Sequence, residues 1–222
     1  FSFYGEEGPV KGFIGDNRYG AIVDPLDGTG AFAIGLPTST VIVGIYDREE
    51  KRLVACVIGE PVSGRFWTAS EKTPTNLKEI PRHVWNGTET GSVFLDVSHG
   101  FKSRGRQMLT DRGNAALYAS LNGAHKILMP GSNGLMQALV ANGRERMAGS
   151  ITTAVGFPGD VCGALLVKQA GGFLKAYERK DDGGLAETDP LDPLNIDALI
   201  CANSKRSLWH LTTAFEAAAT VN

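Results

Sequence analysis

The sequence predicts a mixed α/β protein in which an antiparallel sheet is followed by alternating strands and helices. Residues 19–69 contain short apolar runs separated by turn-forming residues, the pattern of hairpin-connected strands. Beyond Gly91, strand-like runs alternate with longer segments of helical periodicity. Residues 70–91 are rich in Thr, Pro, Asn, Lys and Glu, a composition typical of a connection. We therefore expect two domains, at residues 1–90 and 91–222.

The N-terminal half is expected to form an antiparallel meander. Its predicted strands lie at residues 19–23, 40–46, 53–60 and 65–69. The segment 47–51 is too charged to be buried, and residues 61–64 read Pro-Val-Ser-Gly, which favours a reverse turn. Both segments are therefore expected at hairpin tips that face solvent.

The C-terminal half is expected to form a layered α/β unit. Its predicted strands lie at residues 92–97, 127–129, 147–151, 173–177 and 198–202, and its predicted helices at 106–122, 133–141, 160–170 and 205–219. Gly123 and Gly143 follow two of these helices, and Asn203 or Ser204 caps the last one. Residues 178–197 are expected to form a charged loop that contains proline.

The composition is that of an ordinary soluble globular protein. The 222 residues are 42% hydrophobic and 21% charged, with a formal net charge of −2, which argues against disorder and against a nucleic-acid-coating protein. No run of about 18 apolar residues is present, so we expect no membrane span. With 24 acidic residues against 22 basic ones, bound metal ions are the simplest source of local positive charge for an anionic ligand.

Cysteine and histidine give no sign of a metal or redox centre. Cys56, Cys162 and Cys201 have neither disulfide nor zinc spacing, so we expect free thiols in a reducing cytoplasm, with Cys162 as core filler. The histidines are scattered, and we expect surface or loop positions for all of them: His83, His99, His125 and His210.

The turn Asp24-Pro25-Leu26-Asp27-Gly28-Thr29 is the main candidate for chemistry. It follows an apolar run and precedes a predicted loop, and it places two carboxylates three residues apart at a strand end. Pro25 fixes its own φ, and Gly28 leaves a backbone amide open to a ligand. The carboxylates and the Leu26 carbonyl are hard oxygen ligands that suit magnesium, while the amides of Gly28 and Thr29 suit a phosphate. The turn therefore predicts a magnesium-phosphate site.

Two further segments occur in an order that points to a known family. Gly5-Glu6-Glu7 lies upstream, and Gly159-Asp160-Val161-Cys162-Gly163-Ala164 runs downstream into Gln169-Ala170-Gly171-Gly172. Together with the Asp24 turn, these segments resemble the inositol monophosphatase family of metal-dependent, often lithium-sensitive sugar-phosphate phosphatases. The resemblance implies a layered αβαβα sandwich with its active site between the meander and the α/β half. The helices with which the family usually begins have no counterpart here.

The resemblance also assigns roles to residues. It implies two or three magnesium ions held by Glu6, Asp24, Leu26, Asp27 and Asp160, with Glu6, Asp24 and Thr29 as the catalytic group. Glu6 and Thr29 would orient the attacking water. Gly28, Thr29, Ser132 and Asp160 would face the substrate or its phosphate. Ser132 is equally well explained as a helix N-cap, and Asp160 can both cap a helix and bind metal.

We therefore predict a magnesium-dependent phosphomonoesterase that hydrolyses a small phosphorylated metabolite by metal-activated water. Residues 151–159 lack the glutamate with which the family binds inositol, and residues 32–67 resemble histidinol-phosphate phosphatases of the family, so both substrates stay open. The alternative is an inactive metal-binding or interaction remnant of the same family.

The meander is also expected to leave one apolar face uncovered. Its apolar residues include Val41, Val43, Ile45, Val54, Cys56 and Ile58. We expect that face to be covered by further residues of a longer natural protein or by a second subunit, most simply in a homodimer.

Overall fold

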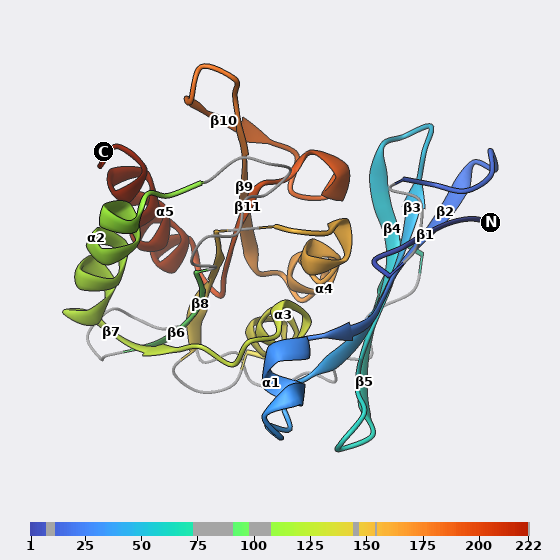
Figure 1. Cartoon of the computed structure of the whole chain (residues 1–222), viewed down its shortest axis with the longest axis horizontal. Helices are drawn as coiled ribbons and strands as arrows, with labels where there is room; N and C mark the ends of the chain where they lie inside the picture. The colour runs from blue at the N-terminus through green and yellow to red at the C-terminus, as the bar shows by residue number, and fades with distance from the viewer. Residues whose placement is uncertain (8–11, 73–90, 98–107, 144–146, 154, 222) are drawn as a thin grey trace.

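Two sheets and four helices form successive layers in the computed structural model, which describes residues 1–7, 12–72, 91–97, 108–143, 147–153 and 155–221. Figure 1 shows the sheet of β1 to β5 on one side, α3 and α4 between it and the second sheet, and α2 and α5 on the far side of that sheet. The predicted mixed α/β layered fold is confirmed. The turn that carries Asp24 and Asp27 belongs to the first sheet and faces the central helices.

The first sheet has the order β1-β2-β3-β4-β5. Its strands are β1 (Ser2–Gly5), β2 (Tyr19–Asp27), β3 (Thr40–Asp47), β4 (Arg52–Glu60) and β5 (Arg65–Ser70). The predicted antiparallel meander is confirmed from β2 to β5. The sequence pattern missed β1, which pairs in parallel with β2 and aligns Gly5 with Val23. This pairing brings the Gly-Glu-Glu segment beside the Asp24 turn.

The second sheet has the order β10-β9-β11-β8-β6-β7. Its strands are β6 (Gly91–Asp96), β7 (His125–Leu128), β8 (Met147–Thr152), β9 (Phe173–Arg179), β10 (Leu185–Thr188) and β11 (Ala198–Ala202). The charged loop predicted at 178–197 is partly wrong, because β9 continues to Arg179 and β10 pairs with it. β10 is a four-residue edge strand with no buried residue, so it lacks the apolar alternation that marks a strand.

The helices are α1 (Thr29–Ala33), α2 (Asp111–Asn122), α3 (Asn133–Ala141), α4 (Ala164–Gln169) and α5 (Lys205–Ala219). The predictions for α3 and α5 are confirmed, and Ser204 caps α5. The helix predicted from residue 106 begins only at Asp111, and residues 108–110 are not helical. The Thr110 side chain caps this helix by accepting from Gly113 N at 3.0 Å. Residues 106–107 lie outside the described part of the chain. α1 occupies part of the stretch predicted as a loop.

The helix predicted at residues 160–170 is two separate elements. A 3-10 turn at Pro158–Val161 is followed by α4, which starts only at Ala164. Pro158 starts the 3-10 turn because a proline at the first helical position lacks only an N–H that would be unpaired there. Asp160 consequently lies within a tight turn and does not cap a longer helix.

Apolar side chains fill two cores, one on each face of the second sheet. The first lies between the two sheets around α3 and α4, and the second lies under α2 and α5. All three cysteines are buried free thiols, and Cys162 belongs to the first core, as predicted. None of the described helices has the length and hydrophobicity needed to cross a bilayer.

One histidine occupies a position that the sequence did not predict. His125 is buried on β7, and its Nε2 lies 3.2 Å from Nδ1 of His210 on α5. The surface or loop position predicted for His125 is therefore wrong, because the helical register of α5 places His210 over an edge strand. His83 and His99 lie outside the described residues.

Candidate metal centre

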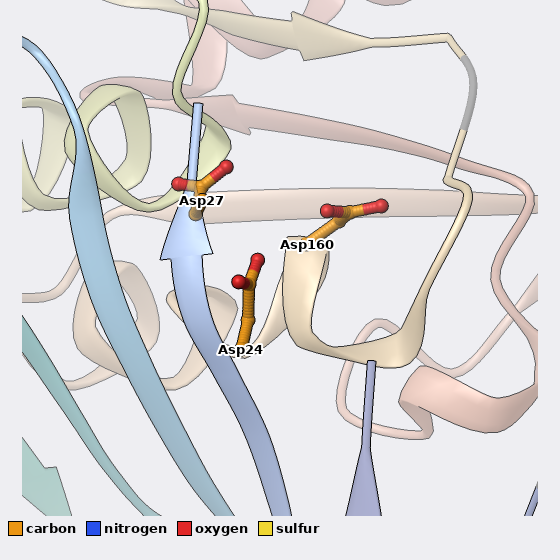
Figure 2. A group of neighbouring side chains, drawn as sticks. All are labelled: Asp24, Asp27 and Asp160. Atoms are coloured by element: carbon orange, nitrogen blue, oxygen red, sulfur yellow. The ribbon is translucent and has the colours of Figure 1, made fainter. Parts of the chain in front are cut away.

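Three carboxylates from two separate elements converge between the sheets. Asp24 and Asp27 come from β2 and Asp160 from the 3-10 turn, and each offers one oxygen that lies within 4.8 Å of the others. Figure 2 shows the three side chains close together, with Asp24 and Asp27 on β2 and Asp160 on the neighbouring turn. Residues three apart on a regular strand point to opposite faces. The pairing of β2 with β3 shifts register between Asp24 and Asp27, so both carboxylates are buried on the inner side.

Asp27 is held by four hydrogen-bond donors. Its Oδ2 accepts from Ser132 Oγ at 2.6 Å, Gly134 N at 2.7 Å and Thr40 Oγ1 at 2.8 Å, and its Oδ1 accepts from Asn133 N at 3.1 Å. The carboxylate thus fixes the N-terminus of α3, where backbone N–H groups lack helical partners. Oδ1 has a single donor and keeps the greater capacity for a further ligand.

Ser132 lies behind Asp27 and is almost fully buried. Its hydroxyl accepts from Leu135 N at 3.2 Å, so it is the N-cap of α3, and it donates to Asp27 at the same time. Of the two roles open for Ser132, the cap is the one observed. The hydroxyl orders a carboxylate at the cluster.

Asp160 and Asp24 are each fixed by backbone amides. Asp160 Oδ2 accepts from Gly156 N at 2.8 Å and from Phe157 N at 2.9 Å. Its side chain thus binds the two residues that precede the 3-10 turn in which Asp160 lies. Asp24 Oδ1 accepts from Leu26 N at 2.9 Å. Such bonds orient carboxylates before a ligand arrives.

The ring of Phe157 packs against Gly159, the residue before Asp160. The Phe157 ring lies edge-on to Tyr4, with the ring centroids 5.2 Å apart. A Cβ on Gly159 would lie 2.7 Å from the Phe157 ring. The glycine therefore leaves room for an aromatic from two residues earlier.

Glu6 and Thr29 lie at the exposed rim of this cluster. Glu6 follows β1, donates its backbone N–H to the Val23 carbonyl at 3.1 Å, and its side chain interacts with Asp24. It is not part of the tight three-carboxylate group. Thr29 Oγ1 donates to the Leu26 carbonyl at 2.9 Å. Gly28 adopts φ +85°, in the left-handed region that favours glycine.

The electrostatics of the cluster favour a cation. Burial and the nearby Glu6 and Asp27 raise the pKa of Asp24 to about 8. Burial raises the pKa of Asp160 to about 8, with Asp27 among the further causes and the Phe157 amide opposing it. Burial also raises the pKa of Asp27, against its four donors. Within the described part of the chain, no Lys, Arg or His lies within ion-pair distance of these three carboxylates.

A fourth carboxylate, that of Asp96, is not predicted by any of the sequence motifs. It ends β6, opposite Thr152 at the end of the parallel strand β8. Asn133 Nδ2 donates to Asp96 Oδ2 at 3.1 Å, and Thr152 Oγ1 donates to Asn133 Oδ1 at 2.8 Å. Burial raises the pKa of Asp96, and the Asp27 charge adds to it. The available signal is an acidic residue near the end of the strand predicted at residues 92–97, since ligand sites of α/β sheets gather at strand ends.

The donor set fits a hard divalent cation. The three convergent carboxylate oxygens and the nearby Leu26 carbonyl are oxygen ligands, which suit Mg²⁺. Backbone amides and hydroxyls already orient the carboxylates, as is usual around metal ligands. A bound cation would also offset the cost of burying ionised carboxylates, which is the main cause of these raised pKa values.

Comparison with known proteins identifies the family of the chain. A family model described as inositol monophosphatase family matches residues 1–219. The chain belongs to the inositol monophosphatase family. The three carboxylates of the acidic cluster lie within the matched residues.

Relatives within the family carry two kinds of name. A Nus factor SuhB of Xylella fastidiosa is 32% identical over 193 residues, which cover 83% of this chain and 65% of the relative. An inositol monophosphatase 3 of Solanum lycopersicum is 30% identical over 154 residues, covering 69% and 55% of the two chains. The chain thus spans less than two thirds of the length of either relative.

Solved structures agree with the fold. The SuhB protein of Bartonella henselae superposes with a TM-score of 0.72 at 23% identity, covering 96% of this chain and 76% of that one. The inositol monophosphatase of Anabaena gives a TM-score of 0.70 at 23% identity, covering 97% and 78%. The layered architecture is therefore that of this inositol monophosphatase family.

Proposed function

We propose that this protein is a magnesium-dependent phosphomonoesterase for a small phosphorylated metabolite. The observation that carries the proposal is the convergence of Asp24, Asp27 and Asp160 from two elements, within 4.8 Å, in a chain of this family. Magnesium held by these residues, with the Leu26 carbonyl and Glu6, would neutralise phosphate charge and make a water molecule more acidic. Inositol monophosphate and histidinol phosphate are the substrates to test first.

The residues of the chain have separate parts in this proposal. Thr29 Oγ1 donates its hydrogen bond to the Leu26 carbonyl. Toward a water molecule it can therefore only accept a hydrogen bond. With Glu6 at the same rim, it would turn the water oxygen toward the phosphorus. The backbone amides of Gly28 and Thr29 would hold a phosphate oxygen, because the first amides of α1 have no helical partner.

The cellular location and the oligomeric state belong to the same proposal. Three buried free thiols suit a reducing cytoplasm. Val57 and Phe66 expose 41% and 61% of their surface on strands of the first sheet, and we propose that a second subunit covers them in a homodimer.

The test is phosphate release from a panel of monoesters with magnesium and with excess EDTA. We expect turnover only with magnesium, and none from Asp24→Asn, because an amide lacks the charge that attracts the ion. Asp182→Asn, in the β9–β10 turn, is the matched control and should retain activity. Turnover unchanged in EDTA would contradict the proposal. Magnesium binding by calorimetry with no hydrolysis of any monoester would favour the inactive remnant.

A further inference from the structure

A buried glutamine lies directly behind the candidate metal centre. Gln137 is on α3, one turn after the residues that hold Asp27, and none of its surface is exposed. Its Nε2 donates to the backbone carbonyl of Asp160 at 2.6 Å. Its Oε1 has no hydrogen-bond partner among the described residues. A buried polar atom without a partner lowers stability, so its presence calls for an explanation.

The surroundings of Gln137 fix the direction of its amide. Exchanging the two amide atoms would set one acceptor against another at the Asp160 carbonyl, so only the observed orientation is favourable. On the other side, Oε1 lies over the backbone of Gly163, where a Cβ would collide with Oε1 and lie 2.7 Å from the Gln137 Cβ. The glycine therefore provides the space that this orientation needs.

Helix α3 thereby contacts two carboxylate-bearing elements. At its N-terminus, the amides of Asn133 and Gly134 hold Asp27, which comes from the first sheet. One turn later, Gln137 holds the main chain of Asp160, which follows β8 of the second sheet. A helix is rigid over a single turn, so these contacts set the separation of Asp27 and Asp160.

We infer that Gln137 is a positioning residue that sets Asp160 at the distance from Asp27 needed to bind a divalent cation. The inference rests on the proposed metal site and assigns Gln137 a role through Asp160, not on the ion. The unpaired Oε1 is then the cost of placing the Nε2 donor where the Asp160 carbonyl needs it.

The test is Gln137→Met, which keeps the length of the side chain and removes both amide atoms. We expect magnesium affinity, measured by calorimetry, to fall about 10- to 100-fold, the usual effect of losing a partner of a metal ligand. The melting temperature in EDTA should change little, because the variant removes an unpaired acceptor while leaving the Asp160 carbonyl without its donor. A merely structural role would lower that melting temperature and leave magnesium affinity intact.

Gln169→Met is the matched control. Gln169 also donates its amide to a backbone carbonyl, that of Ser70, but it lies at the opposite end of α4 from Asp160. Its magnesium affinity should equal that of the wild type. Gly163→Ala is a second variant, which displaces the Gln137 amide without deleting it and should weaken magnesium binding in the same direction.

The outcomes separate this inference from the proposed function. A wild-type protein that binds no magnesium overturns both. A wild-type protein that binds magnesium and hydrolyses monoesters, with Gln137→Met binding magnesium within twofold of it, overturns only the role of Gln137. Equal loss of affinity in Gln137→Met and Gln169→Met would also overturn it, because the effect would then not depend on Asp160.

Discussion

The proposed function gives the hydroxyl of Thr29 the role of orienting a water molecule without binding metal. Its proton goes to the Leu26 carbonyl, and the side chain is exposed at the rim of the carboxylate cluster. We predict that Thr29→Ala lowers kcat on the order of 10²-fold, the scale of a lost proton-transfer geometry. Magnesium affinity should stay within a few-fold of wild type. Steady-state kinetics and calorimetry check the two parts.

Thr29→Ser is the control for Thr29→Ala, because serine retains the hydroxyl and should retain most of the rate. If Thr29→Ala turned over as fast as the wild type, the hydroxyl would serve only the turn. If it lost magnesium affinity along with rate, the Leu26 carbonyl would depend on Thr29 for its position.

Asp24 and Asp160 make the metal-free protein sensitive to pH. Both have folded-state pKa values of about 8, raised first by burial, against about 3.9 in an unfolded chain. A raised carboxyl pKa contributes stability that is complete below the unfolded value and is lost as pH rises through the folded value. We predict that the melting temperature in EDTA falls between pH 5 and pH 9, as measured by thermal unfolding.

Magnesium should reverse this dependence, because it binds the ionised carboxylates and displaces protons. The rise in melting temperature on adding magnesium should therefore be larger at pH 8 than at pH 6. Asp24→Asn should flatten the profile recorded in EDTA. A metal-free melting temperature that rises from pH 6 to pH 9 would be incompatible with these pKa values.

The start of α1 depends on a glycine. Gly28 has φ +85°, and a Cβ there would lie 2.8 Å from the Gly131 carbonyl in the loop before α3. The left-handed conformation alone costs about 1–2 kcal/mol for other residues. We predict that Gly28→Ala lowers the melting temperature by about 2–8 °C, since each kcal/mol shifts a chain of this size by about 2–4 °C. Differential scanning calorimetry measures the shift.

Gly30→Ala is the matched control for Gly28→Ala. Gly30 lies two residues later in α1, and a Cβ there would meet nothing within 4 Å. Because alanine favours a helix more than glycine does, this variant should be neutral or slightly stabilising. Equal destabilisation by both variants would contradict the role given to the Gly131 contact.

Elements with strong local signals were predictable from sequence, and those held by distant partners were not. The strands of the meander and the helices α3 and α5 have clear periodicity, and Ser132 and Ser204 act as caps. β1 has four residues and is defined by its parallel partner β2. The 3-10 turn at Pro158 was merged with α4, because periodicity alone does not reveal where a helix is interrupted.

Sequence motifs predict the carboxylates of the metal centre but not the residues that hold those carboxylates in place. Asp24, Asp27 and Asp160 stand in segments that resemble a family. Gln137 reads as one more residue of an amphipathic helix, and its contact with Asp160 exists only once α3 lies against the 3-10 turn. Such partners depend on tertiary placement, which local sequence does not encode.

Asp27 also joins parts of the molecule that are far apart in the chain. Its four donors come from β3 and from the start of α3, so it links the first sheet to the central helices. An asparagine at this position would have one oxygen and one donor group in place of two acceptors. At least one buried donor would lose its acceptor, at a cost of about 1–3 kcal/mol.

Asp27→Asn and Asp24→Asn should both abolish the response to magnesium. We predict that they nevertheless change the stability of the metal-free protein differently. Asp27→Asn should lower the melting temperature in EDTA at pH 7 by about 5 °C, given about 2–4 °C per kcal/mol for a chain of this size. Asp24→Asn should leave it unchanged or raise it. Its amide can still accept from Leu26 N and resembles the protonated carboxyl expected below a pKa of about 8.

Thermal unfolding of the two variants beside the wild type measures the contrast, and both should unfold in a single transition if the sheets and central helices form one cooperative unit. A larger fall for Asp24→Asn than for Asp27→Asn would mean that α3 is held in place by other contacts. The carboxylate of Asp27 would then serve the metal alone, and the link between the first sheet and α3 would have to come from apolar packing around Ile42 and Leu135.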